Sequence, residues 1–107
     1  MYQNNEERAY KPIDFHNIVL DFTGCKYPAD IHRVLKESFG FPEYYGANWD
    51  ALWDCLNDLF FSSEEALVKI HGTAALDKEM QEYLKPMFEL FGDISEDNSN
   101  IIFQTVS

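Results

Sequence analysis

Three aspartates recur at intervals of four residues in the middle of the chain: Asp50, Asp54 and Asp58. Residues four apart lie on the same side of an α-helix, so a helix would align the three carboxylates. Such a row could act in general acid–base catalysis, hold a hard cation or bind a basic protein surface. The first two uses have no supporting motif, because the chain lacks an EF-hand loop, a His-x-x-x-His pair and a glycine-rich phosphate loop. We therefore predict no catalytic residue, no metal site and no cofactor, and we do not expect an enzyme.

Aromatic and amide side chains accompany this row. Tyr44 and Tyr45 precede it, Trp53 lies within it, and Asn48 adds a neutral hydrogen-bonding group. Aromatic residues beside charged ones are typical of the hot spots of protein interfaces. The alternative is an ordinary solvated helix face whose aromatic neighbours pack in the core, and three carboxylates alone would favour that alternative. The aromatic neighbours favour a protein-binding surface.

The charge of the chain is strongly acidic and is concentrated around this row. The formal net charge is −11, and no Lys or Arg occurs between Lys36 and Lys69, where seven acidic residues lie. This balance argues against nucleic-acid binding, which depends on neutralising phosphates, and against anionic membrane surfaces. It favours attraction to a basic partner.

A helix must present the three aspartates. A 3.6-residue period places Trp49, Leu52, Trp53, Leu56, Leu59 and Phe60 on one face and the aspartates on another. Asn48 is a suitable N-cap, and Asp50 follows in the first turn, where the helix dipole favours an anion. We predict a helix from Asn48 to about Phe60, with Trp49 in the core and Trp53 at the edge of the core beside the aspartates.

The other elements alternate between strand and helix. Apolar runs predict strands at 17–22, 66–71 and 101–106, and helical spacing predicts helices at 28–39 and 77–91. Gly40 should end the first helix, Pro86 should kink or split the last one, and 92–100 should be a loop. Strands separated by helices indicate an α/β fold with a parallel sheet. The 107 residues fit one domain at 15–107 after an N-terminal arm or tail at 1–14, with Tyr2 and Tyr10 as its candidate anchors.

The remaining residues able to do chemistry are scattered. His16, His32 and His71 form no motif, and His32, beside the apolar stripe of its helix, is expected to be structural and hydrogen-bonded. Cys25 and Cys55 lack metal-ligand spacing and are expected to be reduced, with a disulfide between them as the alternative. The polar N-terminus and the lack of a membrane-spanning run predict a cytoplasmic protein.

Several strings in the first half of the chain form a recognisable pattern. They are Asp30-Ile31-His32, Leu35-Lys36, Pro42-Glu43-Tyr44-Tyr45-Gly46, Asn48 and Asp50-Ala51-Leu52-Trp53-Asp54-Cys55-Leu56. In this order they resemble the barstar family of ribonuclease inhibitors, closely from about residue 30 to residue 56. The resemblance implies a small fold in which helices pack around a three-stranded parallel sheet.

The resemblance also implies a function and a site. Members of this family block the active site of a secreted, barnase-like ribonuclease and thereby protect the producing cell. The matched contact residues are Tyr44, Gly46, Asn48, Asp50, Trp53 and Asp54. In the family, the residue matched by Asp54 takes the place of the substrate phosphate, and the residue matched by Tyr44 covers the catalytic histidine. The expected partner is thus a basic extracellular ribonuclease or a related toxin.

The chain departs from the family pattern at the periphery of this site. Asp58 and Leu59 stand where the family has glycine and tryptophan, just past the end of the family's second helix. Leu90 occupies the register of a further acidic contact, with Glu89 adjacent and pointing differently. These changes keep an alternative open, in which the same fold binds a toxin that is not a ribonuclease, or a regulatory protein.

Overall fold

A three-stranded parallel sheet forms one layer of the protein. The computed structural model describes residues 9–61 and 65–106. The strands are β1 (Ile18–Asp21), β2 (Ala66–His71) and β3 (Ile101–Val106), in the order β1-β2-β3. Val68 lies opposite Ile18 on one side and Phe103 on the other. The predicted α/β fold with a parallel three-stranded sheet is confirmed.

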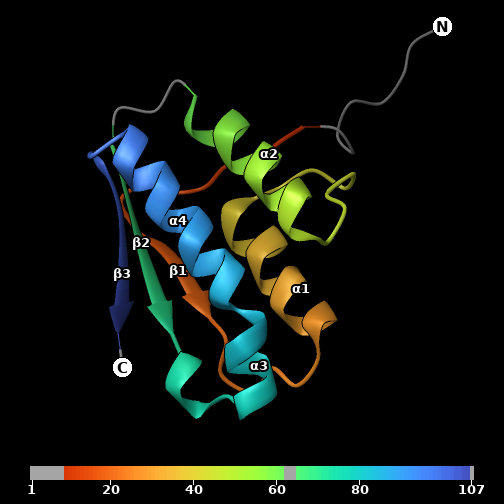
Figure 1. The fold of residues 1–107 in the computed structure, drawn as a ribbon. Helices are drawn as coiled ribbons and strands as arrows, with labels where there is room; N and C mark the ends of the chain where they lie inside the picture. Colours follow the sequence, from red (N-terminus) through yellow and green to blue (C-terminus); the bar gives the residue numbers. More distant parts are fainter. Residues whose placement is uncertain (1–8, 62–64, 107) are drawn as a thin grey trace, which may run out of the picture.

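Helices cover one face of this sheet (Figure 1). α1 contacts β1, α4 contacts β3, and α2 contacts α4, while α3 lies near the strand ends. Because α2 is supported largely by another helix, one long side of it remains exposed. None of the helices among the described residues is both long and apolar enough to cross a membrane. The helical elements are α1 (Pro28–Phe39), α2 (Trp49–Phe60), the 3-10 turn η1 (Thr73–Ala75), α3 (Lys78–Tyr83) and α4 (Lys85–Asp97).

The last helical region differs from its prediction. The expected split near Pro86 is confirmed, since α3 ends at Tyr83 and Pro86 lies in the first turn of α4, where its missing N–H costs nothing. The predicted loop at 92–100 is wrong, because α4 continues to Asp97. Phe91 and Ile94 extend the buried stripe of this helix, and their burial outweighs the cost of about 1 kcal/mol of a helical glycine at 92.

Local signals at both ends define α1. The Oδ2 atom of Asp30 accepts hydrogen bonds from the backbone N–H groups of Lys26, at 2.9 Å, and Tyr27, at 3.1 Å. At the other end Gly40 adopts a left-handed φ of 69°, and a Cβ there would lie 2.5 Å from the carbonyl oxygen of Lys11. Only glycine meets both conditions without strain, so the helix ends where the sequence predicts.

The core lies between the sheet and the helices. Its largest fully buried side chains include Phe22, Phe39, Phe41 and Phe91. The rings of Phe39 and Phe41 stack with centroids 5.3 Å apart, which joins α1 to the start of the following loop. This aromatic packing holds the start of the loop before α2 against the core.

Candidate functional site

The two faces of α2 separate as the helical period predicts. Leu52 and Leu56 are fully buried, whereas Asp50 and Asp54 are exposed. Trp53 is 37% exposed and lies at the border between them. The buried pair holds the helix on the core, so the carboxylates point to solvent on a rigid element.

All six residues that the resemblance implicates lie on the surface. Tyr44 is 57% exposed, and Gly46 and Asn48 are exposed in the same loop and at the helix start. Because the loop leads directly into α2, it brings Tyr44 and Gly46 to the end of the helix that carries Asp50 and Asp54. We call the surface formed by these six residues the α2 face; its members are Tyr44, Gly46, Asn48, Asp50, Trp53 and Asp54.

The start of α2 is fixed by Asn48. Its Oδ1 atom accepts a hydrogen bond from the backbone N–H of Ala51 at 2.8 Å, and its Nδ2 atom donates to the carbonyl oxygen of Gly46 at 3.3 Å. The predicted N-cap is confirmed. Before it, Ala47 has a φ of +55°, a left-handed conformation that costs a residue with a Cβ about 1 kcal/mol or more. The neighbouring contacts must therefore hold the loop in this shape.

A buried histidine anchors the inner side of this loop. His32 is 4% exposed, its Nδ1 atom lies 2.7 Å from the hydroxyl of Tyr45, and its Nε2 atom lies 2.8 Å from the hydroxyl of Tyr83. Its ring also packs on Trp49, with centroids 4.8 Å apart. The predicted structural role of His32 is confirmed. Trp49, expected in the core, is half-buried at its edge.

The protonation state of His32 follows from these surroundings. Burial lowers the pKa of His32 below its ordinary value. A neutral imidazole has one N–H donor and one acceptor nitrogen, so one tyrosine hydroxyl donates to the ring and the other accepts from it. Both ring nitrogens of the uncharged histidine are thus satisfied. The histidine links α1, the loop and α3 behind the α2 face.

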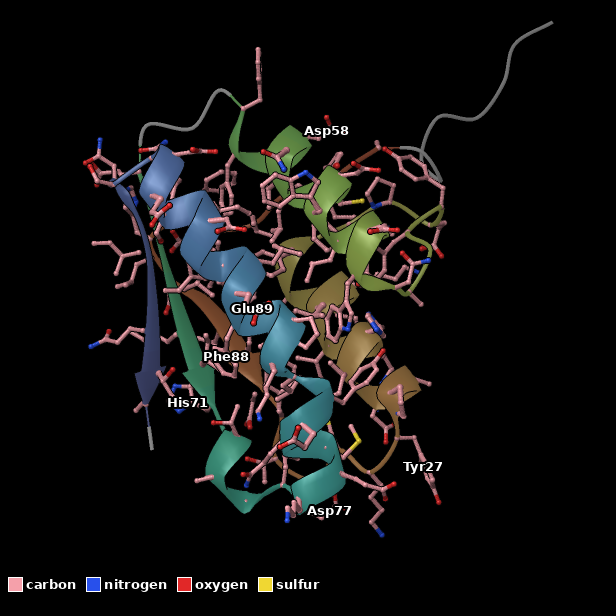
Figure 2. All side chains as sticks on the ribbon, viewed as in Figure 1. Tyr27, Asp58, His71, Asp77, Phe88 and Glu89 are labelled. Carbon is pink, nitrogen blue, oxygen red and sulfur yellow. The ribbon has the colours of Figure 1, made fainter. Side chains whose placement is uncertain are left out.

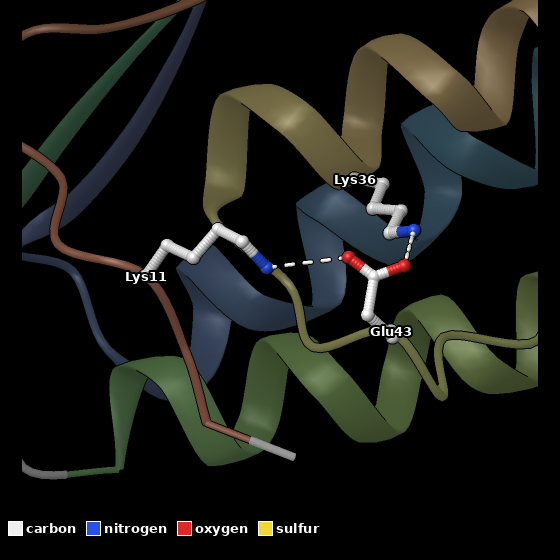
Figure 3. A network of polar contacts seen from close by, with 3 residues as sticks. All are labelled: Lys11, Lys36 and Glu43. Carbon is white, nitrogen blue, oxygen red and sulfur yellow. Dashed lines mark hydrogen bonds and ion pairs between the residues drawn. The ribbon is translucent and has the colours of Figure 1, made fainter. Parts of the chain in front are cut away.

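An ion-pair bridge holds the outer side of the loop (Figure 3). The Oε1 atom of Glu43 lies 2.6 Å from Nζ of Lys36, and its Oε2 atom lies 3.4 Å from Nζ of Lys11. The hydrogen bond from Lys36, followed by that from Lys11, lowers the pKa of the Glu43 carboxyl. Sequence reasoning missed this bridge, because a spacing of seven residues across a loop has no periodic signal.

The carboxylates of the α2 face are left without such partners. Within 9–61 and 65–106, Asp50 and Asp54 form no ion pair with any Lys, Arg or His. Asp58 differs, because its Oδ2 atom lies 3.4 Å from the hydroxyl of Tyr10. In Figure 2 Asp58 lies near the end of α2 and Glu89 lies on α4, where it is exposed beside the buried Leu90. The row Asp50, Asp54 and Asp58 is therefore without an ion pair in the described part of the chain, and only Asp58 has the Tyr10 hydroxyl beside it.

The cysteines and the acidic residues show no further chemistry in the described part of the chain. Cys25 is half-buried and Cys55 is buried, and both are free thiols, so they do not form the disulfide left open above. No group of three His, Cys, Asp or Glu side chains among the described residues is placed to hold a metal ion. What the α2 face offers is a pair of carboxylates, an amide and two exposed aromatic side chains.

Comparisons with known proteins identify the family of this chain. A family model described as "Barstar (barnase inhibitor)" matches residues 15–106, which include the whole of α2 and the loop before it. The protein named "Putative ribonuclease inhibitor YrdF" of Bacillus subtilis (strain 168) is 62% identical over 43 residues. That match covers 40% of this chain and only 36% of the relative. Because the family model covers most of its length, the chain belongs to the barstar family of barnase inhibitors.

Proposed function

We propose that this protein inhibits a barnase-like ribonuclease by inserting the α2 face into the enzyme's active site. One observation carries the proposal: Asp50 and Asp54 are exposed on a rigid helix without a basic partner in the described part of the chain. A ribonuclease must bind phosphate, so its active site is basic, and a carboxylate can occupy a phosphate position. The enzyme would supply the positive charges that α2 lacks.

Each residue of the face has a proposed role. Asp54 is the central anion that replaces the substrate phosphate, and Asp50 is its acidic neighbour. Asn48 retains an amide hydrogen for the partner beyond its bond to Gly46. Tyr44 and Trp53 are the packing anchors, and Gly46 adds no side chain to the loop, so the enzyme can approach the backbone there.

The place where the inhibitor acts follows from the activity of the ribonuclease. An inhibitor of this kind acts as an immunity protein in the cytoplasm of the cell that makes the secreted ribonuclease. The net charge of −11 would attract a basic enzyme from a distance and speed their encounter. The inhibitor itself performs no catalysis.

The direct test is a titration of a purified barnase-like ribonuclease with the full-length protein. We expect RNA cleavage to fall linearly and to stop at one inhibitor per enzyme, because the face blocks the site that binds phosphate. Cleavage that continues at a large molar excess of the protein would refute the proposal. A basic protein without nuclease activity, such as lysozyme, serves as the control for non-specific charge attraction in a parallel binding assay.

Association should depend strongly on salt. Raising the ionic strength from about 0.02 M to about 0.3 M should slow association by more than about tenfold, because screening removes the attraction between an acidic and a basic surface. Stopped-flow fluorescence of the exposed Trp53 would measure the rate. An association rate that does not change with salt would contradict electrostatic steering.

A second candidate function has specific support at the edge of the site. Leu90 is buried in the register where the family has an acidic contact, and Asp58 and Leu59 replace the family's glycine and tryptophan. These changes favour a partner whose outer surface differs from that of barnase, including a toxin that is not a ribonuclease or a regulatory protein. Capture of a basic protein without ribonuclease activity from the source cells would support this second function.

A further inference from the structure

A short segment before β1 contacts the loop that leads into α2. We call residues 10–13 the strap; they lie outside the segment 15–106 that the family model matches. The backbone N–H of Lys11 donates to the carbonyl oxygen of Gly40 at 2.8 Å. The ring of Tyr10 packs edge-on against Phe41, with centroids 6.2 Å apart. The strap therefore touches the loop where α1 ends.

The strap also contacts Glu43 in the loop and Cys55 in α2. The hydroxyl of Tyr10 donates to the carbonyl oxygen of Cys55 at 3.1 Å, in the middle of α2. The Nζ atom of Lys11 forms its ion pair with Glu43, which directly precedes Tyr44 of the α2 face. Figure 3 shows Lys11 and Lys36 approaching Glu43 from two separate segments. One short segment thus links the end of α1, the loop and α2.

The geometry of the loop indicates why it needs this link. Ala47 lies in the left-handed region at a φ of +55°. Gly40 packs directly against the strap, because a Cβ at this position would lie 2.5 Å from the carbonyl oxygen of Lys11. A loop in a strained conformation persists only when its surroundings determine it. The inner side is held by His32 through Tyr45, and the strap holds the outer side.

The hydroxyl of Tyr10 has a second possible acceptor. The Oδ2 atom of Asp58 lies at 3.4 Å, and a single O–H can donate to this atom or to the carbonyl oxygen of Cys55 at one time. Either way the strap contacts the second half of α2. This hydrogen bond distinguishes Asp58 from Asp50 and Asp54, to which no strap residue donates in the described part of the chain.

We propose that the strap is a positioning element that holds the loop at 41–47, through Phe41 and Glu43, and the middle of α2, through Cys55, in the conformation that binds the partner. The inference rests on the function proposed above and adds a segment that lies outside the matched family region. An ordered loop loses less conformational freedom on binding, so the strap should lengthen the life of the complex without touching the partner's active site.

The test removes the contacts of the strap one at a time in the full-length protein. Tyr10→Phe deletes one hydroxyl that donates to a backbone carbonyl, and Lys11→Ala deletes one arm of the Glu43 bridge. Ser95→Ala is the matched control, because the Oγ atom of Ser95 donates to the carbonyl oxygen of Ile101 at 2.7 Å, between α4 and β3. All three variants keep the α2 face intact.

Hydrogen exchange in the free protein gives the first readout. The N–H of Tyr45 donates to Pro42 within the loop, at 3.1 Å. We expect Tyr10→Phe to speed exchange at this amide by about fivefold, the net worth of one hydrogen bond, and Lys11→Ala by about twofold, since its ion pair is exposed, each relative to Ser95→Ala. Equal exchange in the strap variants and in the control would overturn the proposal.

Dissociation of the complex with a barnase-like ribonuclease gives the second readout. Tyr10→Phe should dissociate about fivefold faster and Lys11→Ala about twofold faster than the wild-type protein, while Ser95→Ala should dissociate at the wild-type rate. Unchanged dissociation in the strap variants would also overturn the proposal. If the wild-type protein binds no ribonuclease, the proposed function fails, and the exchange measurement alone then decides whether the strap orders the loop.

Discussion

Helices α1 and α2 have the same length and opposite uses of charge. Each has 12 residues and buries one face. On α1, Asp30 accepts two backbone N–H groups and pairs with Arg33, and Lys36 pairs with Glu43. On α2, Asp50 and Asp54 pair with nothing in the described ranges.

The charges of α1 stabilise the fold, whereas those of α2 are left free to bind another protein. On α1, Asp30 lies in the first turn and Lys36 in the last turn, where each complements the helix dipole. The last turn of α2 has no basic residue, and its aspartates repel one another at spacings of four. A helix that gains little from its own charges can gain from those of another protein.

The strongest test of this comparison is Asp54→Ala. We expect the affinity for a barnase-like ribonuclease to fall by at least about 30-fold, or about 2 kcal/mol, because Asp54 is the proposed centre of the interface. The barnase–barstar complex is itself the familiar source of such hot-spot magnitudes, which are known for that pair and are not a result of this structure. Titration calorimetry would measure the loss.

Asp58→Ala is the matched control for this change. It removes the same side chain one turn later, where Tyr10 already approaches the carboxylate. We expect a much smaller loss of affinity. Equal losses in the two variants would show that the centre of the interface is misplaced.

The buried polar group of α1 should affect stability more than any exposed charge of α2. His32→Leu should lower the free energy of unfolding by about 2 kcal/mol, because the hydroxyls of Tyr45 and Tyr83 lose their partner. Urea denaturation of both proteins at pH 7.5 would measure the difference. A change below about 0.5 kcal/mol would mean that the cluster does not hold the loop.

The same substitution should change the pH dependence of stability. Since burial lowers the folded-state pKa of His32, the unfolded chain takes up a proton near pH 6.5 that the folded protein does not accept. Stability of the wild-type protein should therefore fall as the pH drops from about 7 through the folded-state pKa. The fall should be smaller in His32→Leu, in which His16 and His71 are unchanged, and equal slopes would contradict the assignment.

Asp30→Ala should show the reverse of the Asp54 result. It removes the acceptor of two backbone N–H groups at the start of α1, so the melting temperature should fall by a few degrees. Affinity for the ribonuclease should stay within about twofold, since Asp30 lies outside the α2 face. A loss of affinity in the folded variant would break the division between the two helices.

The smallest effect on stability is expected from Asp54→Asn. It keeps the size of the side chain and removes a charge four residues from both Asp50 and Asp58, so stability should rise by about 0.3 kcal/mol. Affinity for the ribonuclease should still fall. Chemical denaturation and calorimetry on the same sample would show whether stability and binding move in opposite directions, and a loss of both would argue against like-charge repulsion on α2.

Much of the fold was open to prediction because its signals are local. The spacing of Leu52 and Leu56 predicts the buried side of α2, and Asn48 and Gly40 mark helix ends through their own backbone chemistry. The end of α4 was predicted wrongly, because Gly92 is a local signal that the burial of Ile94 overrides. Local propensity is weak against several buried contacts.

The contacts behind the candidate site were beyond prediction for the same reason. His32 was expected to be hydrogen-bonded, but its partners are 13 and 51 residues away in sequence. The Lys11–Glu43 pair spans 32 residues. No pattern in a single sequence encodes such distances, because they are set by how separate elements pack.

Sequence and tertiary structure thus account for different properties of the α2 face. The order and spacing of residues 44–54 are enough to place two carboxylates and their aromatic neighbours on one side of a helix, since helix geometry is a local consequence of the backbone. Only the packed structure shows that no basic residue of another segment approaches Asp50 and Asp54 in the described ranges, while Lys11 and Lys36 approach Glu43. Such pairing between segments depends on how they approach one another in space, which the order of the chain does not specify.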